Sequence, residues 1–192
     1  MNPPRILVFG GSLRAGSLNQ QVAALAAAAA REAGADVTLI ALRNFPLPLF
    51  DADLEAAAGM PEPARQLKAL FSAHDGLIIA SPEYNGSFSA ALKNALDWVS
   101  RATTENEAPL AALAGKTAAI LAASPGGYGG ARGLAQLRPF LGNIRINVIE
   151  PQVTIPQAHT VIGPDGAIAD QAIADSVRAL AHALVAAMKA AG

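Results

Sequence analysis

Five short apolar stretches, each followed by a segment of helical composition, constrain the fold of this chain more than any other feature. The first, Arg5–Phe9, is apolar throughout after its arginine, as in a parallel strand that helices cover on both faces. Four further strands are predicted at residues 36–42, 76–80, 116–123 and 145–149. Helices are predicted at residues 18–33, 64–73, 89–101, 131–141 and 169–191. This alternation predicts an α/β fold, a doubly wound five-stranded parallel sheet with helices on both faces, in a single domain spanning residues 1–192.

Two segments depart from the alternation. Residues 43–63 contain four of the thirteen prolines, so we expect a loop there with room for one short helix. Residues 161–168 contain Gly163-Pro164-Asp165-Gly166, a strong turn signal that predicts a small hairpin. Gly34 follows the first helix, at a place where a residue with positive φ is usually required.

The composition excludes several classes of protein. Hydrophobic residues make up 52% of the 192 positions and charged residues only 15%, which is typical of a compact globule rather than a disordered chain. The net charge is −1 and no cluster of lysine and arginine occurs, so nucleic acid is not an expected partner. The longest apolar run, Val22–Ala30, is far shorter than the roughly 20 residues of a membrane span, so we expect a cytoplasmic protein.

The chain has no cysteine, which removes disulfides, thiolate metal sites and a cysteine nucleophile. Its three histidines lie far apart in the sequence, without the spacing of metal ligands, and no metal site is expected. Any redox chemistry must therefore come from a cofactor.

Ligands of open parallel sheets bind beyond the carboxyl ends of the strands, so the loops that follow the strands are the candidate binding segments. The first such loop, Gly10–Asn19, opens a helix, whose unpaired N–H groups and positive dipole end attract an anion. Ser12, Ser17 and Asn19 add side-chain donors, and Arg14 adds a guanidinium fork that suits a phosphate. The spacing matches neither the dinucleotide fingerprint nor the Walker A loop, which favours a cradle for a terminal monophosphate. The alternative is an ordinary capped helix with Ser17 as its N-cap.

Two later loops have the composition of a site for a flat ring. In Ser81–Ser87, Pro82 fixes the backbone, Tyr84 offers an aromatic face and Asn85 an amide; the alternative is a rigid turn with a packed tyrosine. In Ser124–Gly130, four glycines in five residues allow backbone amides to approach a ligand closely, where they would stabilise negative charge on a bound ring. The alternative there is a flexible loop.

Several motifs together resemble one family. They are Gly11-Ser12-Leu13-Arg14 with Ser17 and Asn19, Pro48–Asp53, Ser81–Ser87, Leu92–Arg101, and Gly129-Gly130-Ala131-Arg132 with Leu137-Arg138. The chain is similar, over roughly residues 5–150, to the NADPH-dependent FMN reductases, which include flavoproteins that reduce chromate, quinones and azo compounds. The resemblance implies a flavodoxin-like fold with noncovalently bound FMN.

The family's binding residues carry over to matching positions. By resemblance, the phosphate contacts would come from Ser12, Arg14, Ser17 and Asn19. The ring contacts would come from Pro82, Glu83, Tyr84 and Asn85, with Ser124, Gly126 and Gly127 on the other side. Ser89 and Ala90 stand where many relatives have Pro and Gly, a difference that bears on the start of the next helix and on the pocket mouth.

The resemblance also implies a homodimer or homotetramer. In such an assembly the helix Leu92–Arg101 either contributes to pairing or serves only the core of its own chain. The implied reaction is ping-pong: NADPH or NADH gives a hydride to FMN, and a small-molecule acceptor (a quinone, a flavin, an azo compound or chromate) then takes the electrons. No catalytic acid or base is required, and none is assigned; Asp51 and Asp53, in their proline-rich setting, are interpreted as turn or cap residues.

Other classes of function are weighed against this one. A flavodoxin-type electron carrier would commonly be very acidic, whereas this chain has a net charge of −1. A flavin-binding sensor without NAD(P)H oxidase activity, or a scaffold without cofactor, stays open at this point. A dinucleotide-binding dehydrogenase is disfavoured because the first loop lacks the required spacing and no acidic residue ends the second strand.

Overall fold

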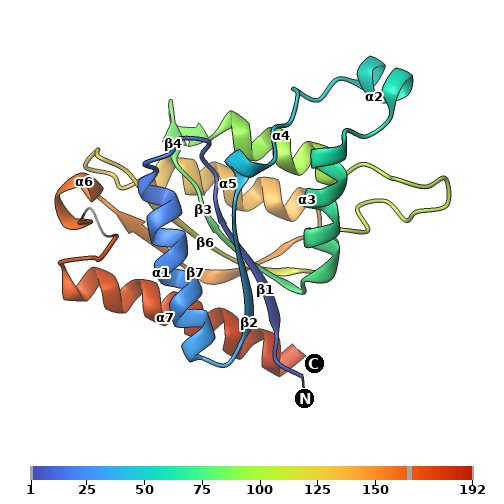
Figure 1. The fold of residues 1–192 in the computed structure, drawn as a ribbon. Coiled ribbons are helices and arrows are strands. Elements are labelled where there is room, and N and C mark those ends of the chain that lie inside the picture. Colours follow the sequence, from blue (N-terminus) through green and yellow to red (C-terminus); the bar gives the residue numbers. More distant parts are fainter. Residues whose placement is uncertain (1, 164–165, 192) are drawn as a thin grey trace.

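The computed structural model describes residues 2–163 and 166–191, and its centre is one sheet of five parallel strands (Figure 1). The strands are β1 (Arg5–Gly10), β2 (Asp36–Ala41), β3 (Gly76–Ala80), β6 (Thr117–Ala123) and β7 (Asn147–Ile155). Their order in the sheet, β2-β1-β3-β6-β7, confirms the predicted doubly wound, flavodoxin-like arrangement. From β1 the chain first moves outward to β2 and then returns to β3, so the switch point lies between β1 and β3.

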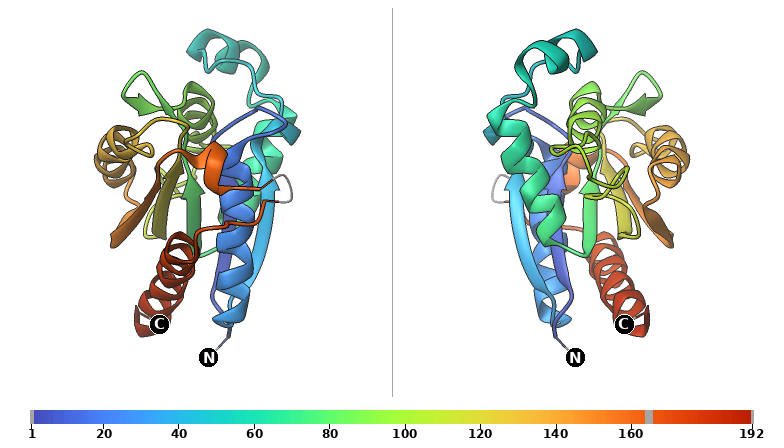
Figure 2. Two further views of the ribbon diagram at one scale, coloured as in Figure 1. Left: turned by 90° about the vertical axis from the view of Figure 1, so that its left-hand side faces the viewer. Right: turned by 90° about the vertical axis from the view of Figure 1, so that its right-hand side faces the viewer.

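Helices cover both faces of the sheet (Figures 1 and 2). One face carries α1 (Leu18–Glu32) and α7 (Gln171–Ala191), and the other carries α3 (Glu62–Ala73), α4 (Ala90–Val99) and α5 (Ala131–Asn143). The alternation of side chains along β1 explains its continuous apolar run. Ile6 and Val8 enter the core beneath α1 and α7, whereas Leu7 and Phe9 enter the opposite core.

The short elements lie in the segments that connect the long helices and strands. They are the 3-10 helix η1 (Leu42–Asn44), α2 (Ala52–Ala58), α6 (Ala158–Val161), and the hairpin of β4 (Glu83–Tyr84) and β5 (Ser87–Phe88). The short helix α2 agrees with the expectation for residues 43–63, and it projects from the body of the molecule (Figure 2). The hairpin was expected only as a turn-rich loop, because strands of two residues are too short to show a period.

The last strand differs from its predicted range. We expected it at residues 145–149, but β7 continues past Pro151 to Ile155. Proline has no N–H to donate to a neighbouring strand, so it is not expected in a central strand. However, β7 is an edge strand. Its register with β6 shifts between Ala118 and Ile120, which leaves Pro151 in an irregular stretch. Arg138 of α5 donates to the carbonyl oxygens of Ile149 (2.8 Å) and Glu150 (3.1 Å) there.

The chain between α6 and α7 reverses direction at one antiparallel bridge between Ile162 and Ile168, within the predicted hairpin. Pro164 and Asp165, at the centre of the expected turn, lie outside the described residues. Helix α7 begins two residues after the predicted position because Asp170 caps it, accepting from the N–H groups of Ala172 (2.9 Å) and Ile173 (3.2 Å).

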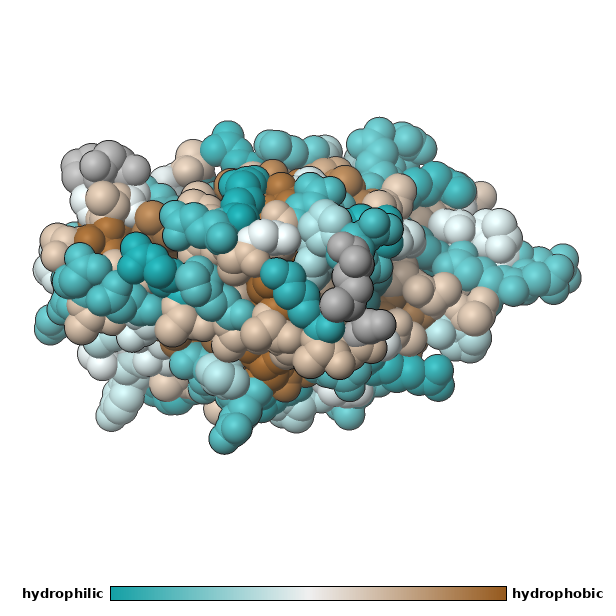
Figure 3. Space-filling model, turned by 90° about the horizontal axis from the view of Figure 1, so that it is seen from below, coloured by the Kyte–Doolittle hydropathy of each residue, from teal (hydrophilic) through white to brown (hydrophobic). Residues whose placement is uncertain are grey.

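Across residues 2–163 and 166–191, every helix is too short or too polar to cross a membrane. Figure 3 looks onto the end of the molecule where both termini lie, and on this face hydrophobic side chains form small patches between hydrophilic ones. The predicted site residues belong to loops at the opposite end, which the sheet reaches at the carboxyl ends of its strands (Figure 1).

Candidate functional site

The three loops singled out from the sequence meet at the carboxyl end of the sheet. They enclose a pocket of about 100 Å³. Its lining consists of Ser12, Arg14, Ser17, Leu18, Asn19, Pro82, Glu83, Tyr84, Ala123, Ser124 and Pro125. Eight of the eleven predicted site residues are in this lining, and the other three, Asn85, Gly126 and Gly127, belong to the same loops without lining this pocket.

The first loop presents hydrogen-bond donors that the protein itself does not use. In the described part of the chain, the backbone N–H groups of residues 15, 16, 18 and 19 find no acceptor, although Asn19 is 97% buried. The Arg14 guanidinium likewise has no hydrogen bond or ion pair to a described residue. These donors converge on the first turn of α1, where the helix dipole also favours an anion. The donor set therefore fits a phosphate group.

Ser12 and Ser17 order this loop. The Ser17 hydroxyl oxygen accepts from the Gln20 N–H (3.3 Å), so Ser17 is the N-cap of α1. The Ser12 oxygen accepts from the Arg14 N–H (3.2 Å). Each hydroxyl keeps its proton as a donor for a ligand, so the capping role and a binding role are compatible.

The prediction that the Asn19 side chain is a donor for the ligand is wrong, because the protein uses this side chain itself. Its Nδ2 donates to the Ala123 carbonyl (2.8 Å) and its Oδ1 accepts from the Ala123 N–H (2.9 Å). Ala123 is the last residue of β6, and the neighbouring strand β3 has already ended beside it. The Asn19 amide thus takes the place of a strand residue at the end of the ladder. What Asn19 still offers to a ligand is its backbone N–H.

Gln20 is a structural residue of the site that sequence reasoning missed. Its Oε1 accepts from the Gly10 N–H (3.0 Å), and its Nε2 donates to the Ile40 carbonyl (3.0 Å). The first turn of α1 is thereby tied to the ends of β1, β2 and, through Asn19, β6. No pattern near Gln20 indicates this role, because the partners come from separate strands.

The second loop forms the β4–β5 hairpin. Its two central residues, Asn85 and Gly86, have φ of 53° and 81°, which are the positive values that a type I′ turn requires. The rigid turn is therefore present, but Tyr84 is not packed, since it is 53% exposed at the pocket. The carboxylate of Glu83 turns away to α5, where it pairs with Arg132.

Ser89 connects the second loop to the first. Its hydroxyl accepts from the Leu92 N–H (3.1 Å), which makes it the N-cap of α4, and it donates to the Gly11 carbonyl. A proline at this position could make neither bond, because its side chain has no polar atom. In this chain Ser89 ties the start of α4 to the candidate phosphate loop.

The four glycines of the third loop divide into two pairs. Gly129 and Gly130 have positive φ, and a Cβ on them would lie 2.7 Å from Pro156 N and 2.5 Å from Ala122 Cβ. These two are required by the fold. Gly127 has open space around it, so its backbone is free for close approach by a ligand. The Gly126 N–H, in contrast, donates to the Ser124 hydroxyl oxygen (3.2 Å), and the Gly126 carbonyl accepts from Gly129 and Gln157.

A second and larger cavity, of about 670 Å³, lies on the other side of the first loop. It is lined mostly by apolar residues: Leu13, Leu42, Arg43, Phe45, Pro46, Leu47, Pro48, Ala91, Asn94 and Ala95. Sequence reasoning did not identify it, because its walls come from the segment after β2 and from α4. Leu92, Leu96 and Trp98 of α4 are buried in the chain's own core.

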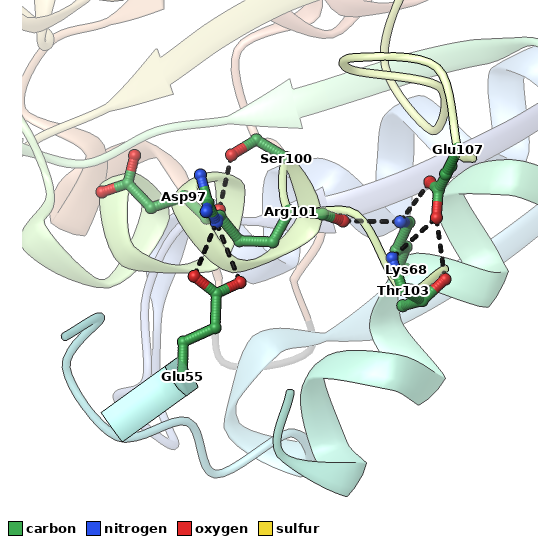
Figure 4. A network of polar contacts seen from close by, with 7 residues as sticks. All are labelled: Glu55, Lys68, Asp97, Ser100, Arg101, Thr103 and Glu107. Carbon is green, nitrogen blue, oxygen red and sulfur yellow. Dashed lines mark hydrogen bonds and ion pairs between the residues drawn. The ribbon is translucent and has the colours of Figure 1, made fainter. Parts of the chain in front are cut away.

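A polar network holds the far end of α4 to its neighbours (Figure 4). Arg101 pairs with Glu55 of α2 (2.9 Å), and Lys68 of α3 donates to the Arg101 carbonyl (2.5 Å) and pairs with Glu107. The Lys68 ammonium, together with the N–H and hydroxyl of Thr103, lowers the pKa of Glu107 to about 2.

Known proteins resemble this chain in both sequence and fold. The profile of the family described as NADPH-dependent FMN reductase matches residues 4–160. An NAD(P)H-dependent FMN reductase of Pseudomonas aeruginosa is 33% identical over 187 residues, covering 94% of this chain and 92% of its own. A quinone reductase of Escherichia coli K12 is 34% identical over 163 residues, covering 77% and 82%.

Among solved structures, the flavoenzyme NAD(P)H:(acceptor) oxidoreductase FerB from Paracoccus denitrificans superposes with a TM-score of 0.79 at 30% identity. The match covers 95% of this chain and 96% of FerB. These relatives confirm the predicted oxidoreductase class, with FMN as cofactor and NAD(P)H as hydride donor. By the extent of the match and the geometry of its loops, the chain belongs to the NADPH-dependent FMN reductase family.

Proposed function

We propose that this protein binds FMN by its phosphate in the Gly11–Asn19 loop and reduces quinone-class acceptors with NAD(P)H as the electron donor. The observation that carries the proposal is the convergence of unpaired backbone N–H groups, two serine hydroxyls and the Arg14 guanidinium on the N-terminus of α1. The names of the relatives from E. coli and P. aeruginosa support the choice of acceptor and donor.

In this proposal the phosphate is held by the hydroxyls of Ser12 and Ser17, by Arg14, and by the backbone N–H of Asn19. When bound, FMN supplies the hydride-accepting and electron-donating chemistry. The protein binds and orients it: Pro82, Glu83, Tyr84 and Asn85 form one wall, and Ser124, Gly126 and Gly127 form the other. The backbone amide of Gly127 would stabilise negative charge at the ring.

We also propose a homodimer or homotetramer. Two large apolar side chains are exposed: Leu13 of the first loop is 57% exposed, and Leu49, which follows Pro48 of the larger cavity, is 77% exposed. Burying such side chains against a second copy would remove them from water. Sedimentation velocity of the purified protein measures the assembly, and a monomer at micromolar concentration would contradict this part of the proposal.

The function is tested by spectroscopy and rapid mixing. The purified protein is expected to show a flavin absorption spectrum, or to acquire one on addition of FMN. Anaerobic stopped-flow mixing with NADPH, and separately with NADH, should bleach that spectrum in a single turnover. A second mixing with benzoquinone should restore it. Protein that takes up no FMN, or holds FMN that neither nucleotide reduces, would refute the proposal.

The acceptor is tested by steady-state kinetics with a quinone, free flavin, an azo dye and chromate. The ratio of kcat/KM values decides among them, since specificity is a ratio of these constants rather than activity with any one compound. A quinone-class enzyme should have its highest kcat/KM with the quinone. A higher value for any of the other three would reassign the acceptor.

A further inference from the structure

The carboxylate of Glu83 is buried and held by α5. Its side chain is only 7% exposed, although Glu83 precedes the exposed Tyr84. Oε1 accepts from two nitrogens of Arg132, at 2.8 Å and 2.6 Å, and Oε2 accepts from the backbone N–H of Gly133 at 3.1 Å. A buried carboxylate with this set of partners is fixed in position.

The same carboxylate supplies a cap that α5 lacks. The N-cap residue of this helix is Gly130, which has no side chain to accept a hydrogen bond. Glu83, from a hairpin 50 residues earlier in the chain, accepts the N–H of Gly133 in the first turn instead. A negative charge at this end of a helix is also favoured by the helix dipole.

The hairpin and α5 touch at Gly133. A Cβ on Gly133 would lie 3.2 Å from the Glu83 Cβ and 3.3 Å from the Ser87 carbonyl oxygen. On the other side, the Arg132 guanidinium lies 5.1 Å from the centre of the Tyr128 ring in the third loop. Glu83 and Arg132 therefore connect the second loop with the third.

We infer that Glu83 is a positioning residue: its carboxylate clamps the hairpin to the N-terminus of α5 and so sets the spacing between the two loops proposed to flank the flavin ring. This inference rests on the proposed function for the identity of the ring. It assigns no chemical step to Glu83, whose carboxylate faces Arg132 and Gly133.

The clamp is tested with two variants and one control. Glu83→Gln keeps the shape of the side chain and removes its charge. Gly133→Ala keeps the charge and pushes the hairpin away by a few tenths of an ångström. Gly142→Ala is the matched control, because it lies in the same helix and no atom comes within 4 Å of its added Cβ.

The first measurement is the Kd of FMN and of riboflavin, which has the same ring without phosphate. The two clamp variants should weaken both flavins by a similar factor, about tenfold, the effect of losing one charged hydrogen bond. The control should bind as the wild type does. Weakening of FMN alone, or unchanged binding of both flavins, would overturn the clamp.

The second measurement needs no flavin and separates the clamp from the proposed function. Hydrogen exchange of the amides in residues 83–88 is expected to be faster in Glu83→Gln and Gly133→Ala than in the wild type and the Gly142→Ala control. Unchanged exchange would overturn the clamp whether or not FMN binds. A wild type that binds no flavin, together with faster exchange in the two variants, would refute the proposed function and leave the clamp supported.

Discussion

Asn19→Ala is expected to destabilise the protein substantially, although the residue lies in a loop-to-helix junction. The wild-type amide makes two hydrogen bonds with the backbone of Ala123, at 2.8 Å and 2.9 Å, and is 3% exposed. Truncation leaves a buried N–H and a buried C=O without partners. Each such group costs about 1–3 kcal/mol, so the free energy of unfolding should fall by roughly 2–6 kcal/mol. That is a large part of the ~5–15 kcal/mol of an ordinary domain.

Urea unfolding without cofactor measures this loss. With a slope of about 2 kcal/mol per molar urea, the expected shift of the midpoint is roughly 1–3 M to lower urea. Asn106→Ala is the control, because Asn106 is exposed and should unfold at the wild-type midpoint. An Asn19→Ala midpoint equal to that of the control would refute the role assigned to the amide.

Asn19→Asp adds a pH test to the same site. The ionised carboxylate can accept from the Ala123 N–H but repels the Ala123 carbonyl, whereas the protonated acid can make both bonds. Folding would therefore raise the pKa of this introduced acid. Its stabilising contribution is present below the unfolded-state pKa and is lost as the pH rises through the folded-state pKa. The deficit relative to wild type should be small near pH 4 and large at pH 7.

Three further outcomes are expected. Arg14→Ala should weaken FMN binding by roughly 1.5–3 kcal/mol, as measured by titration calorimetry, and should leave riboflavin binding unchanged; equal FMN affinity would remove Arg14 from the site. Glu107→Gln should lower the free energy of unfolding by roughly 2–3 kcal/mol at pH 7. Because folding depresses the pKa of Glu107 from 4.5 to about 2, this difference should shrink as the pH falls through that interval, and a difference independent of pH would contradict the assignment. Gly129→Ala should lower the midpoint of thermal unfolding, since its Cβ would lie 2.7 Å from Pro156 N at a φ of 59°; a Gly127→Ala control, with no atom within 4 Å, should not.

The local structure of the site is encoded by short sequence patterns. The apolar run of β1, the hydroxyl of Ser17 at the start of α1 and the Asn85-Gly86 pair each act on residues within a few positions. Neighbours in sequence are necessarily neighbours in space, so such patterns are readable before the chain is folded. The parallel alternation of strands and helices then places the loops after β1, β3 and β6 at one edge of the sheet.

The strand ends were less predictable, and β7 shows why. Pro151 argues against a strand when it is read locally, because it cannot donate to a ladder. Pro151 is tolerated because β7 is at the edge of the sheet and because Arg138 of α5 donates a hydrogen bond to the carbonyl oxygen of Ile149 in the irregular stretch. Both conditions depend on which elements become neighbours in the folded chain.

The sequence alone therefore determined the fold class and the three candidate loops, and it predicted an anion site in the first. Only the tertiary structure decided what individual side chains in those loops do. Asn19 binds a residue 104 positions away and Glu83 binds one 50 positions away. A polar side chain has the same hydrogen-bonding capacity whether it faces a ligand or a distant backbone group, and its direction is set by packing between elements that no local pattern records.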